Sequence, residues 1–546
     1  MTAETPAPDR AGAVPDPRPD ESSAGRRIAR NSAIFSIATG ASRIAGLVRE
    51  VVASSYFATS GAFSSFTIAF QVPNLIRALV ADAAISSAFV PVFTELLEKG
   101  RKREAFRLAS TLLLLILAGL GALTAIFVLV APVLIPAVTG SKFTPALDDL
   151  TVGLSQVLFP IVVLLGLTGL IVGILNAYEH FAVPAVAPLV WNLVIIGVLV
   201  GLHDAFSGPD QLYAYAIGVL VGTAVQFAMA VWVLRRLGFH LELAFDWRDP
   251  RVRQVMKLML PVSIGLGIIN IDLLINSTLG TLVSDQAPRA IDAAFRIYML
   301  PQGMFSVAVA TVLFPTLSRF AARRDLDQLR ATMSVGVRQI FLLLVPAAVI
   351  TLVLSRPIVR VVYQHGAFGP RSTDKVSEAL FWFSFSLPFA GVNLLLTRTF
   401  FSLQQPWTPT ALAGANIVIN FVVSLALYKP FGIAGLVIGT AVASAGMMGV
   451  QALYLRRSLG GTLEGARTLA AVLRILLASA VLGGVAYGAW AGLDAALGRA
   501  VWAQIASVGV AITAGLAAYS IAVLMLRIRE AQQIRALLTR RLGRGA

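Results

Sequence analysis

Long apolar runs separated by short polar loops dominate the chain from about residue 30 onward. Each run holds roughly 18 or more mostly apolar residues, the length that crosses a bilayer as an α-helix. The runs are continuous, whereas a membrane β-strand would alternate apolar and polar positions. We therefore expect an all-α polytopic membrane protein with about 14 transmembrane helices. The expected spans are 31–57, 64–96, 107–136, 149–177, 183–202, 211–234, 254–284, 290–318, 334–354, 376–402, 408–428, 432–455, 469–491 and 500–526.

The sequence also repeats itself at an offset of about 225 residues, which indicates an internal duplication. Several matches occur in the same order in both copies, and each copy runs from one matched proline-containing segment into a basic loop. One matching tetrapeptide would mean little, but four ordered matches favour a duplicated gene. The matching pairs are AF at 69–70 and 294–295, Pro184 and Pro409, Asn192 and Asn416, and GTAV at 222–225 and 439–442.

Each copy would hold about six spans, so the two copies would point the same way across the membrane, as in transporters built from parallel repeats. The site is then expected between the halves. We expect a disordered cytoplasmic tail at 1–25, six-helix lobes at 26–238 and 250–460, two extra helices at 466–530, and a basic cytoplasmic tail at 531–546.

The net charge of +16 is spread over the loops and not gathered in one domain. This distribution argues against nucleic-acid binding and instead marks the cytoplasmic side, where loops of membrane proteins are rich in lysine and arginine. Both termini are then expected in the cytoplasm. One segment breaks the rule, because it is basic and falls on the outer side. It carries Arg356, Arg360, Arg371 and Lys375.

Several arginines lie inside the apolar runs, at depths where lipid penalises charge. An arginine near the middle of a membrane helix costs roughly 2.5–3.5 kcal/mol, so it needs a protein interior, a partner or water. Such a cluster favours a multiply anionic ligand, because the guanidinium fork matches phosphate geometry and stays charged. The alternative is that these arginines snorkel to an interface or pair with Glu50 and Asp82. The candidate ligand residues are Arg43, Arg49, Arg77 and Arg296, with Ser42 and Asn74 beside them.

Other polar residues inside the apolar spans favour either a cation site or helix packing. Oxygen ligands from these side chains could hold a monovalent cation such as sodium. Asparagine and threonine in membrane helices commonly form interhelical hydrogen bonds as well, and the sequence leaves both readings open. The residues concerned are Asp272, Asn276, Asn416, Asn420 and Thr440.

The sequence offers little material for an enzyme. It has no cysteine and only four scattered histidines, which leaves no transition-metal site or thiol nucleophile. The acids that we expect at the depth of the arginines are Glu50, Asp82 and Asp272, with no aspartate-rich metal motif near them. We therefore expect a transporter with no catalytic residues and no cofactor, with sodium as a candidate coupling ion.

Two long motifs and a short one resemble the MurJ (MviN-type) lipid II flippases of the multidrug/oligosaccharidyl-lipid/polysaccharide exporter superfamily. The short motif is Ser42-Arg43 followed by Arg49. In two places the chain departs from the family pattern, with Ser64 where the family usually has an aspartate and Asn420 where an acid is expected. The long motifs are AFQVPNLIRALVADAAISSAFVPVF at 69–93 and AFRIYMLPQGMFSVAVATVLFPTLSR at 294–319.

This resemblance implies translocation of the undecaprenyl-linked peptidoglycan precursor, lipid II, across the bacterial cytoplasmic membrane by alternating access. It implies that Arg43, Arg49, Arg77 and Arg296 line a cationic central cavity and are needed for function, and that the last two helices form a groove for the lipid tail. Within that cavity we predict that Arg43, Arg49 and Arg296 hold the pyrophosphate and that Arg77 helps close the cytoplasmic side. Membrane lipids and cell-wall synthesis proteins are the expected neighbours of a monomer. Residues Asp82 and Glu50 are expected to form a gate ion pair.

Two other functions remain open at this point. The first is export of another lipid-linked oligosaccharide, or drug/cation antiport, by a member of the same superfamily. Export of cationic drugs would be favoured by a cavity lined with acids, whereas the cavity expected here is basic. The second is a scaffold that recruits wall-synthesis proteins without transport, which requires the buried arginines to be dispensable. If those arginines lack counter-charges, the cavity should respond to the membrane potential when it reorients.

Overall fold

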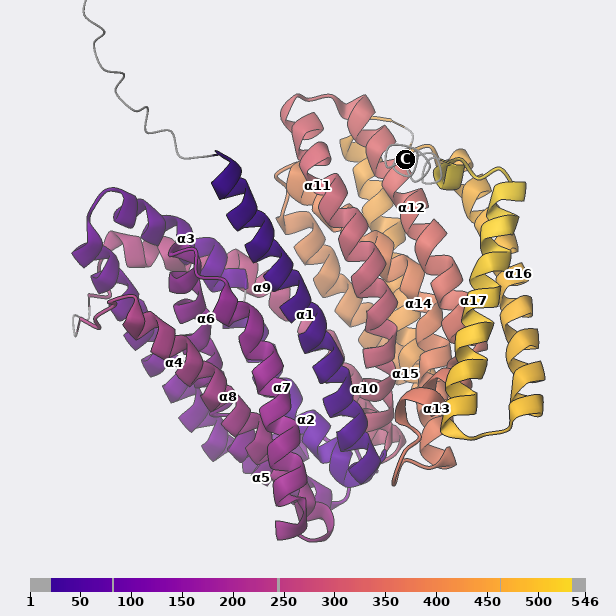
Figure 1. Ribbon diagram of the computed structural model, residues 1–546, viewed down its shortest axis with the longest axis horizontal. Coiled ribbons are helices and arrows are strands. Elements are labelled where there is room, and N and C mark those ends of the chain that lie inside the picture. Colours follow the sequence, from indigo (N-terminus) through magenta and orange to yellow (C-terminus); the bar gives the residue numbers. More distant parts are fainter. Residues whose placement is uncertain (1–20, 81–82, 243–245, 462, 533–546) are drawn as a thin grey trace, which may run out of the picture.

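The structure, a computed structural model, describes residues 21–80, 83–242, 246–461 and 463–532, and within these ranges it consists of helices joined by short loops. Two groups of helices stand side by side, with one further helix pair at the edge of the second group (Figure 1). The N-terminal half contains α1 (Glu21–Phe57), α2 (Gly61–Val80), α3 (Ala83–Glu98), α4 (Lys102–Val138), α5 (Pro145–Leu158), α6 (Ile161–Ala177), α7 (Ala182–Leu202), η1 (His203–Ala205), η2 (Gly208–Gln211) and α8 (Leu212–Arg236).

The C-terminal half is built from the next helices, and the edge pair follows them. The C-terminal half contains α9 (Pro250–Val283), α10 (Ala287–Pro301), the short π-helix η3 (Gln302–Ser306), α11 (Val307–Ala322), α12 (Leu326–Val353), α13 (Ser355–Tyr363), α14 (Pro370–Ser402) and α15 (Trp407–Ser458). The edge pair is α16 (Gly465–Leu497) and α17 (Val501–Met525), which pack on each other and on α12.

The surface of these helices is suited to lipid. Among the described residues, ten helices are long and apolar enough to cross a membrane. Large apolar side chains also point outward on them: Leu129 of α4 is 79% exposed and Trp502 of α17 is 82% exposed. Water would penalise this much exposed apolar surface, whereas the hydrocarbon core of a bilayer accepts it. The expected all-α polytopic membrane protein is confirmed.

Several expected spans correspond to more than one helix or to part of one. Residues 64–96 form α2 and α3, residues 149–177 form α5 and α6, and α15 contains two expected spans joined at Gly432, whose φ of 57° lies outside the helical region. The count of about 14 spans is compatible with this grouping. One boundary differs, since α1 begins at Glu21 and residues 21–25, assigned above to the tail, are helical.

Separate apolar cores hold each half together. Phe89 and Phe93 belong to a core of the N-terminal half, whereas Tyr363 and Phe383 belong to the large core of the C-terminal half. The long helix α9 joins the two, because Val252 near its start packs in the first core and Leu279 near its end packs in the second.

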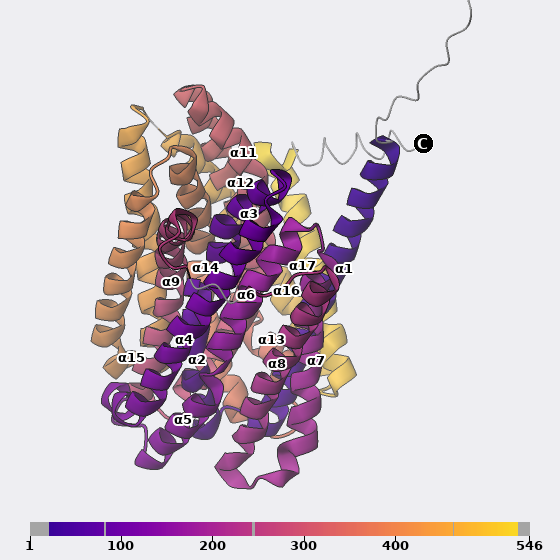
Figure 2. The same ribbon diagram turned by 90° about the vertical axis from the view of Figure 1, so that its left-hand side faces the viewer.

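The halves meet at the end of the bundle opposite the described termini, which we call the distal end. The other end, where α1 begins and the described chain stops, is the terminal end; there the first turns of α1 project from the bundle (Figure 2). At the distal end, the Ala367 N–H donates to the Ser55 carbonyl at 2.7 Å, and Thr59 donates to Ser372 at 2.8 Å. These four residues are named the distal clamp.

Two further hydrogen bonds join the halves beside the distal clamp. Gln71 of α2 donates to Ser277 of α9 at 3.0 Å, and the Gly140 N–H donates to Thr281 at 2.6 Å. With these contacts, the structure is closed between the halves at the distal end.

Candidate functional site

Helix α10 presents a charged face to the N-terminal half. Arg289, Asp292 and Arg296 occupy positions i, i+3 and i+7 of an otherwise apolar helix, so their side chains share one face. This face lies against α1 and α2, and it places charged groups at the contact between the halves.

Glu50 of α1 is the acid that faces these arginines. One of its carboxylate oxygens lies 2.5 Å from Nη2 of Arg289, and the other lies 3.4 Å from Nη1 of Arg296. The second oxygen is also 3.8 Å from Nη2 of Arg49, its neighbour in sequence. A single buried carboxylate therefore links two arginines of the C-terminal half to one of the N-terminal half.

Asp292 supplies the second negative charge. Its Oδ2 accepts hydrogen bonds from Nη1 of Arg289 and from Nε of Arg296, each at 2.9 Å. We call Arg49, Glu50, Arg289, Asp292 and Arg296 the charge cluster. It holds three positive and two negative side chains, a net charge of +1, which reduces the large cost of burying isolated charges.

Arg289 is held on every side by the N-terminal half. It donates through Nη2 to Ser54 at 2.8 Å, and its guanidinium carbon lies 3.9 Å above the ring of Phe63. Its backbone N–H donates to Oγ of Ser64 at 3.3 Å. These contacts make Arg289, whose side chain is only 1% exposed, a structural link between the halves.

Arg296 and Arg49 make fewer contacts with other side chains than Arg289 does. The side chain of Arg296 is 36% exposed, whereas Arg49 is buried, with its guanidinium 4.9 Å from the ring centre of Trp191. Within the described part of the chain, Nε of Arg49 is buried without a hydrogen-bond partner. These two arginines therefore keep donors that an incoming anion could use.

A cavity of about 200 Å³ opens beside the charge cluster. Glu50, Arg289, Asp292 and Arg296 form its charged wall, and aromatic side chains form much of the rest. Such a mixture of a few charged groups and apolar walls suits a ligand with an anionic head and an apolar body. Other lining residues are Phe63, Phe66, Phe70, Tyr215 and Phe295.

The structure brings together part of the predicted site. Arg49, Glu50 and Arg296 meet in the charge cluster, and Asn74 lines its cavity. Asn74 also accepts hydrogen bonds from Nε and Nη2 of Arg77, at 3.1 and 3.0 Å, as their i, i+3 spacing suggested.

Other predicted residues lie away from the cluster or outside the described residues. Arg43 is exposed and lies six residues before Arg49 on α1, a rise of about 9 Å toward the terminal end. The carbonyl of Ser42 accepts a hydrogen bond from Asn192 at 3.4 Å. Asp82 is outside the described residues, so its predicted ion pair with Glu50 stays a prediction.

Sequence reasoning missed Arg289 and Asp292. The acids expected at this depth were Glu50, Asp82 and Asp272, and Asp292 is a further one that pairs with two arginines. Arg296 has counter-charges in Glu50 and Asp292, so for this residue the alternative of pairing with an acid is the one that the structure shows. The spacing of three charges on one face of residues 287–301 was the available signal.

The predicted cation residues form a second polar cluster, within the C-terminal half. Nδ2 of Asn420 donates to Oδ1 of Asp272 at 2.6 Å and to Oδ1 of Asn276 at 3.2 Å, while Asn276 donates to Thr440 at 3.1 Å. Asn416 is not in this network, and its buried Oδ1 has no hydrogen-bond partner among the described residues.

This second cluster fits a cation only in part. Its donors are mainly oxygens, as a hard cation requires, and Oδ1 of Asn416 is an orphan one turn before Asn420. The amide of Asn420, however, already occupies Asp272 with a hydrogen bond that a carboxylate at position 420 could not donate. The interhelical hydrogen bonds expected as the alternative are present.

Comparison with known proteins gives a consistent picture. The sequence model of the family "Lipid II flippase MurJ" matches residues 53–494. A curated relative, "Probable lipid II flippase MurJ" of Rhizobium meliloti (strain 1021), is 32% identical over 430 residues, covering 76% of this chain and 78% of the relative.

Solved structures share the fold. "Lipid II flippase MurJ, inward closed conformation" is similar with a TM-score of 0.74 at 24% identity, covering 90% of this chain and 99% of that one. An inward-facing multidrug resistance MATE family transporter of the MOP superfamily is similar with a TM-score of 0.65 at 14% identity, covering 77% and 94%.

Proposed function

We propose that this chain, which belongs to the lipid II flippase MurJ family, carries lipid II across the bacterial cytoplasmic membrane by alternating access. As a member of this family it is a transporter and not an enzyme. The observation that carries the proposal is the charge cluster between the halves, where arginines of both halves share one buried carboxylate beside an aromatic-walled cavity.

Arg296 and Arg49 would take the pyrophosphate of the ligand. Their guanidinium forks can each donate two parallel hydrogen bonds to a phosphate, and Arg43 would extend the cationic surface toward the terminal end. Glu50 lies at ion-pair distance from both arginines, 3.8 Å from Arg49 and 3.4 Å from Arg296. The carboxylate would thus act as a stand-in for the anion and would be displaced from Arg296 and Arg49 when the ligand binds.

Displacement of Glu50 would couple binding to opening. The same carboxylate also holds Arg289, the residue of the C-terminal half that is most deeply packed into the N-terminal half. A ligand that competes for the shared arginines rearranges the contacts that close the distal end. Binding and distal opening are then linked, because the ligand favours the state in which this contact is weaker.

The orientation follows from the loop charges. The basic loops lie at the terminal end, so we place this end in the cytoplasm and the distal end on the outer side of the inner membrane. The closed distal end is then the ligand-loading state. The apolar tail of lipid II would lie along the edge pair α16 and α17, as the family resemblance implies.

Sodium is a further candidate in this mechanism. The cluster around Asp272 would hold the ion through Asp272, Asn276, Asn416 and Thr440, and the bound cation would supply a coupling free energy between the gradient and the state of the C-terminal half. Asn420 in place of an acid leaves this cluster with one carboxylate, which favours weak binding.

The direct test is depletion of the protein in its native host with lipid II measured on each side of the membrane. Lipid II should accumulate on the cytoplasmic side, and unchanged lipid II with altered surface polysaccharide would refute the proposal and favour another lipid-linked oligosaccharide. Complementation then tests the site. Arg296→Ala should abolish transport at normal expression, and Arg296→Lys should restore little because the bidentate fork is lost. Arg319→Ala, on the exposed end of α11, is the matched control and should complement fully.

A further inference from the structure

A second basic pocket lies at the distal end, far from the charge cluster in sequence and built by the C-terminal half and the edge pair. It has a volume of about 150 Å³, roughly ten times what one water molecule requires. Arg356 and Arg360 of α13 and Arg499 of the α16–α17 connection line it, together with Gln364 and Gln504. We call it the distal basic pocket.

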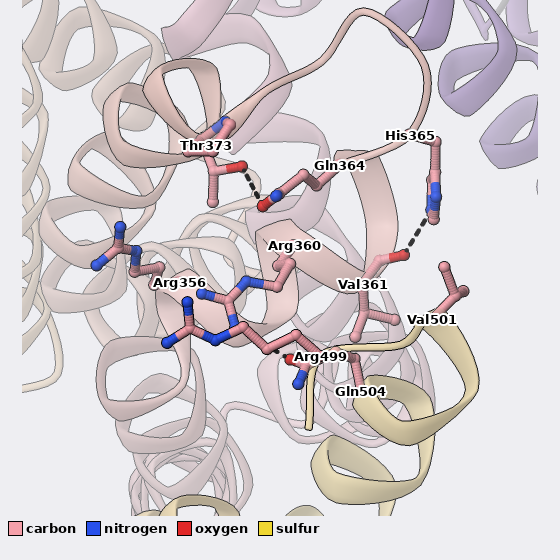
Figure 3. A pocket seen from close by; sticks show the side chains of 10 residues that line it. Arg356, Arg360, Val361, Gln364, His365, Thr373, Arg499, Val501 and Gln504 are labelled. Carbon is pink, nitrogen blue, oxygen red and sulfur yellow. Dashed lines mark hydrogen bonds between the residues drawn. The ribbon is translucent and has the colours of Figure 1, made fainter. Parts of the chain in front are cut away.

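Two of the three arginines of the distal basic pocket lie side by side, and the guanidinium of Arg356 lies apart from them (Figure 3). Arg360 and Arg499 extend alongside each other, with Gln504 on one side and the hydrogen-bonded pair Gln364 and Thr373 on the other (Figure 3). Burial and the neighbouring Arg499 lower the pKa of Arg360, which sits on a helix too short to cross a membrane. A cation in this position is stabilised by an added negative charge.

The acid nearest Arg360 and Arg499 forms only long ion pairs with them. Asp494 lies 3.7 Å from Arg360 and 3.9 Å from Arg499, beyond hydrogen-bond distance, and it accepts a hydrogen bond at 2.5 Å from Gln504 instead. Arg360 donates to the neutral Oε1 of Gln504 at 3.2 Å. Only Arg356 has a hydrogen-bond-length ion pair, with Asp374 at 2.8 Å.

Two helix N-termini add to the positive potential. Helix α14 begins at Pro370 and α17 begins at Val501, and both residues line the pocket. The free N–H groups and the dipole at a helix N-terminus favour anions. The pocket thus combines three guanidinium groups, two helix N-termini and an open volume, on the side where loop charge predicts few basic residues.

We propose that the distal basic pocket is a binding site for a phosphate-bearing anion, separate from the pyrophosphate site of the charge cluster. Guanidinium forks on Arg360 and Arg499 bind the phosphate, and Gln364 and Thr373 border it. The phosphate comes either from a pyrophosphate head group released on the outer side or from the phosphodiester of an anionic membrane lipid, since basic pockets beside membrane helices bind lipid head groups.

The pocket shares a wall with the distal clamp. Residues 364–373 line the pocket at both ends, and between them Ala367 and Ser372 hold α1. A bound phosphate therefore stabilises the segment on which the N-terminal half closes. Phosphate binding at this site and closure of the distal end should therefore favour each other.

The test uses the full-length protein with two probes. In neutral detergent without added phospholipid, pyrophosphate is titrated at constant ionic strength and the thermal unfolding midpoint is followed. In a second experiment, the protein is placed in nanodiscs that contain phosphatidylglycerol or phosphatidylcholine. It is then released from the nanodiscs in the mass spectrometer, and native mass spectra give the number of lipids of each kind that stay bound to it. Binding of pyrophosphate alone identifies a head-group source and binding of phosphatidylglycerol alone identifies a membrane lipid; either result supports the site.

Variants assign the binding to this pocket. Arg360→Gln with Arg499→Gln should weaken the effective probe at least tenfold, and Arg499→Gln alone should weaken it measurably while the fold is kept, because that side chain is 75% exposed. Arg456→Gln with Arg457→Gln removes the same charge from the exposed last turn of α15, away from the distal basic pocket, and should change nothing. Arg296→Gln should leave this binding in place, which separates it from the charge cluster.

The proposal is overturned if neither probe binds the wild-type protein, or if the Arg360 and Arg499 variants bind as tightly as wild type. It is also overturned if the Arg456 and Arg457 control loses as much affinity, because the effect would then reflect net charge alone. If an Arg296 variant loses lipid II transport but still binds phosphate, the result supports the transport role of the charge cluster and, separately, the phosphate site in the distal basic pocket.

Discussion

Replacing Glu50 by glutamine should open the distal end of the empty protein. Glu50 is 3% exposed and lies at salt-bridge distance from Arg49, Arg289 and Arg296. Glutamine keeps the shape of the side chain and removes the charge. Arg289 would keep Asp292 as its acid, while Arg49 would lose the only acid with which it forms an ion pair among the described residues.

The magnitude follows from the burial of the ion pair. Removing one partner of a buried pair costs about 3–5 kcal/mol, because the remaining charge is left without compensation. The pairs of Glu50 with Arg289 and Arg296 join the two halves, so this cost falls on the distally closed state and not on either half alone. Since about 1.4 kcal/mol corresponds to a factor of ten, a cost of about 3 kcal/mol shifts the closed-to-open ratio by about 100-fold.

The chain has no cysteine, so a single introduced thiol reports on opening. Thr67 of α2 is 6% exposed and lines the cavity of the charge cluster, which makes Thr67→Cys a conservative probe there. A membrane-impermeant maleimide is added to intact cells, and the labelling rate at position 67 is compared with and without Glu50→Gln. We expect labelling from outside to rise by one to two orders of magnitude.

A matched substitution controls for the loss of one acid. Glu104 pairs with Arg101 and Arg251 at 2.6 Å, but on an exposed surface at the terminal end. Glu104→Gln should leave labelling at position 67 unchanged. An unchanged or slower labelling rate in Glu50→Gln would refute the argument that this carboxylate holds the distal end closed.

Three further outcomes are expected. Gly366→Ala should lower the thermal stability of the purified protein and raise the labelling rate at position 67 from outside. The reason is that φ at Gly366 is +58° and an added Cβ would lie 2.5 Å from the Ser55 carbonyl. Gly369→Ala is the control and should be neutral, because an added Cβ there meets open space. Asn420→Asp should place a second carboxylate beside Asp272. The unfolding temperature should then rise more when sodium replaces choline in the variant than in the wild-type protein. An equal rise in both proteins would argue against a cation at this cluster. In a flipping assay, collapse of the membrane potential with sodium held constant should slow transport, and a rate that responds only to sodium would refute a potential-driven return.

The sequence predicts the helices well because span length depends only on local composition. Apolar runs of the right length appear as helices throughout the described residues. The subdivision of the runs is less predictable. Pro160 lies in the break between α5 and α6, and Gly432 interrupts α15, but a proline such as Pro73 also lies inside the uninterrupted helix α2. Tertiary packing decides which of these sites bends.

The candidate site was predicted where charge stands out against an apolar run. Arg49, Glu50 and Arg296 lie well inside such runs. Arg289 was missed because it precedes the expected span 290–318, where an arginine is ordinarily an interfacial residue. Its ion pair with Glu50 joins positions 239 residues apart, and a single sequence carries no signal for that contact.

The counter-charges change how the membrane potential can act on this protein. Several uncompensated arginines would each contribute about 2.3 kcal/mol per 100 mV for a full crossing, whereas the charge cluster carries a net charge of +1. If the cluster moved through the whole field, the bias toward the inward-facing state would be about 2.3 kcal/mol at 100 mV, or about 50-fold. In the proposed mechanism, a bound pyrophosphate would reverse the sign of the cluster, and the loaded protein would be driven toward the outer side instead. Glu50 and Asp292 therefore bring the empty protein close enough to neutrality for one ligand to invert its response to the potential, which three unpaired arginines would not allow.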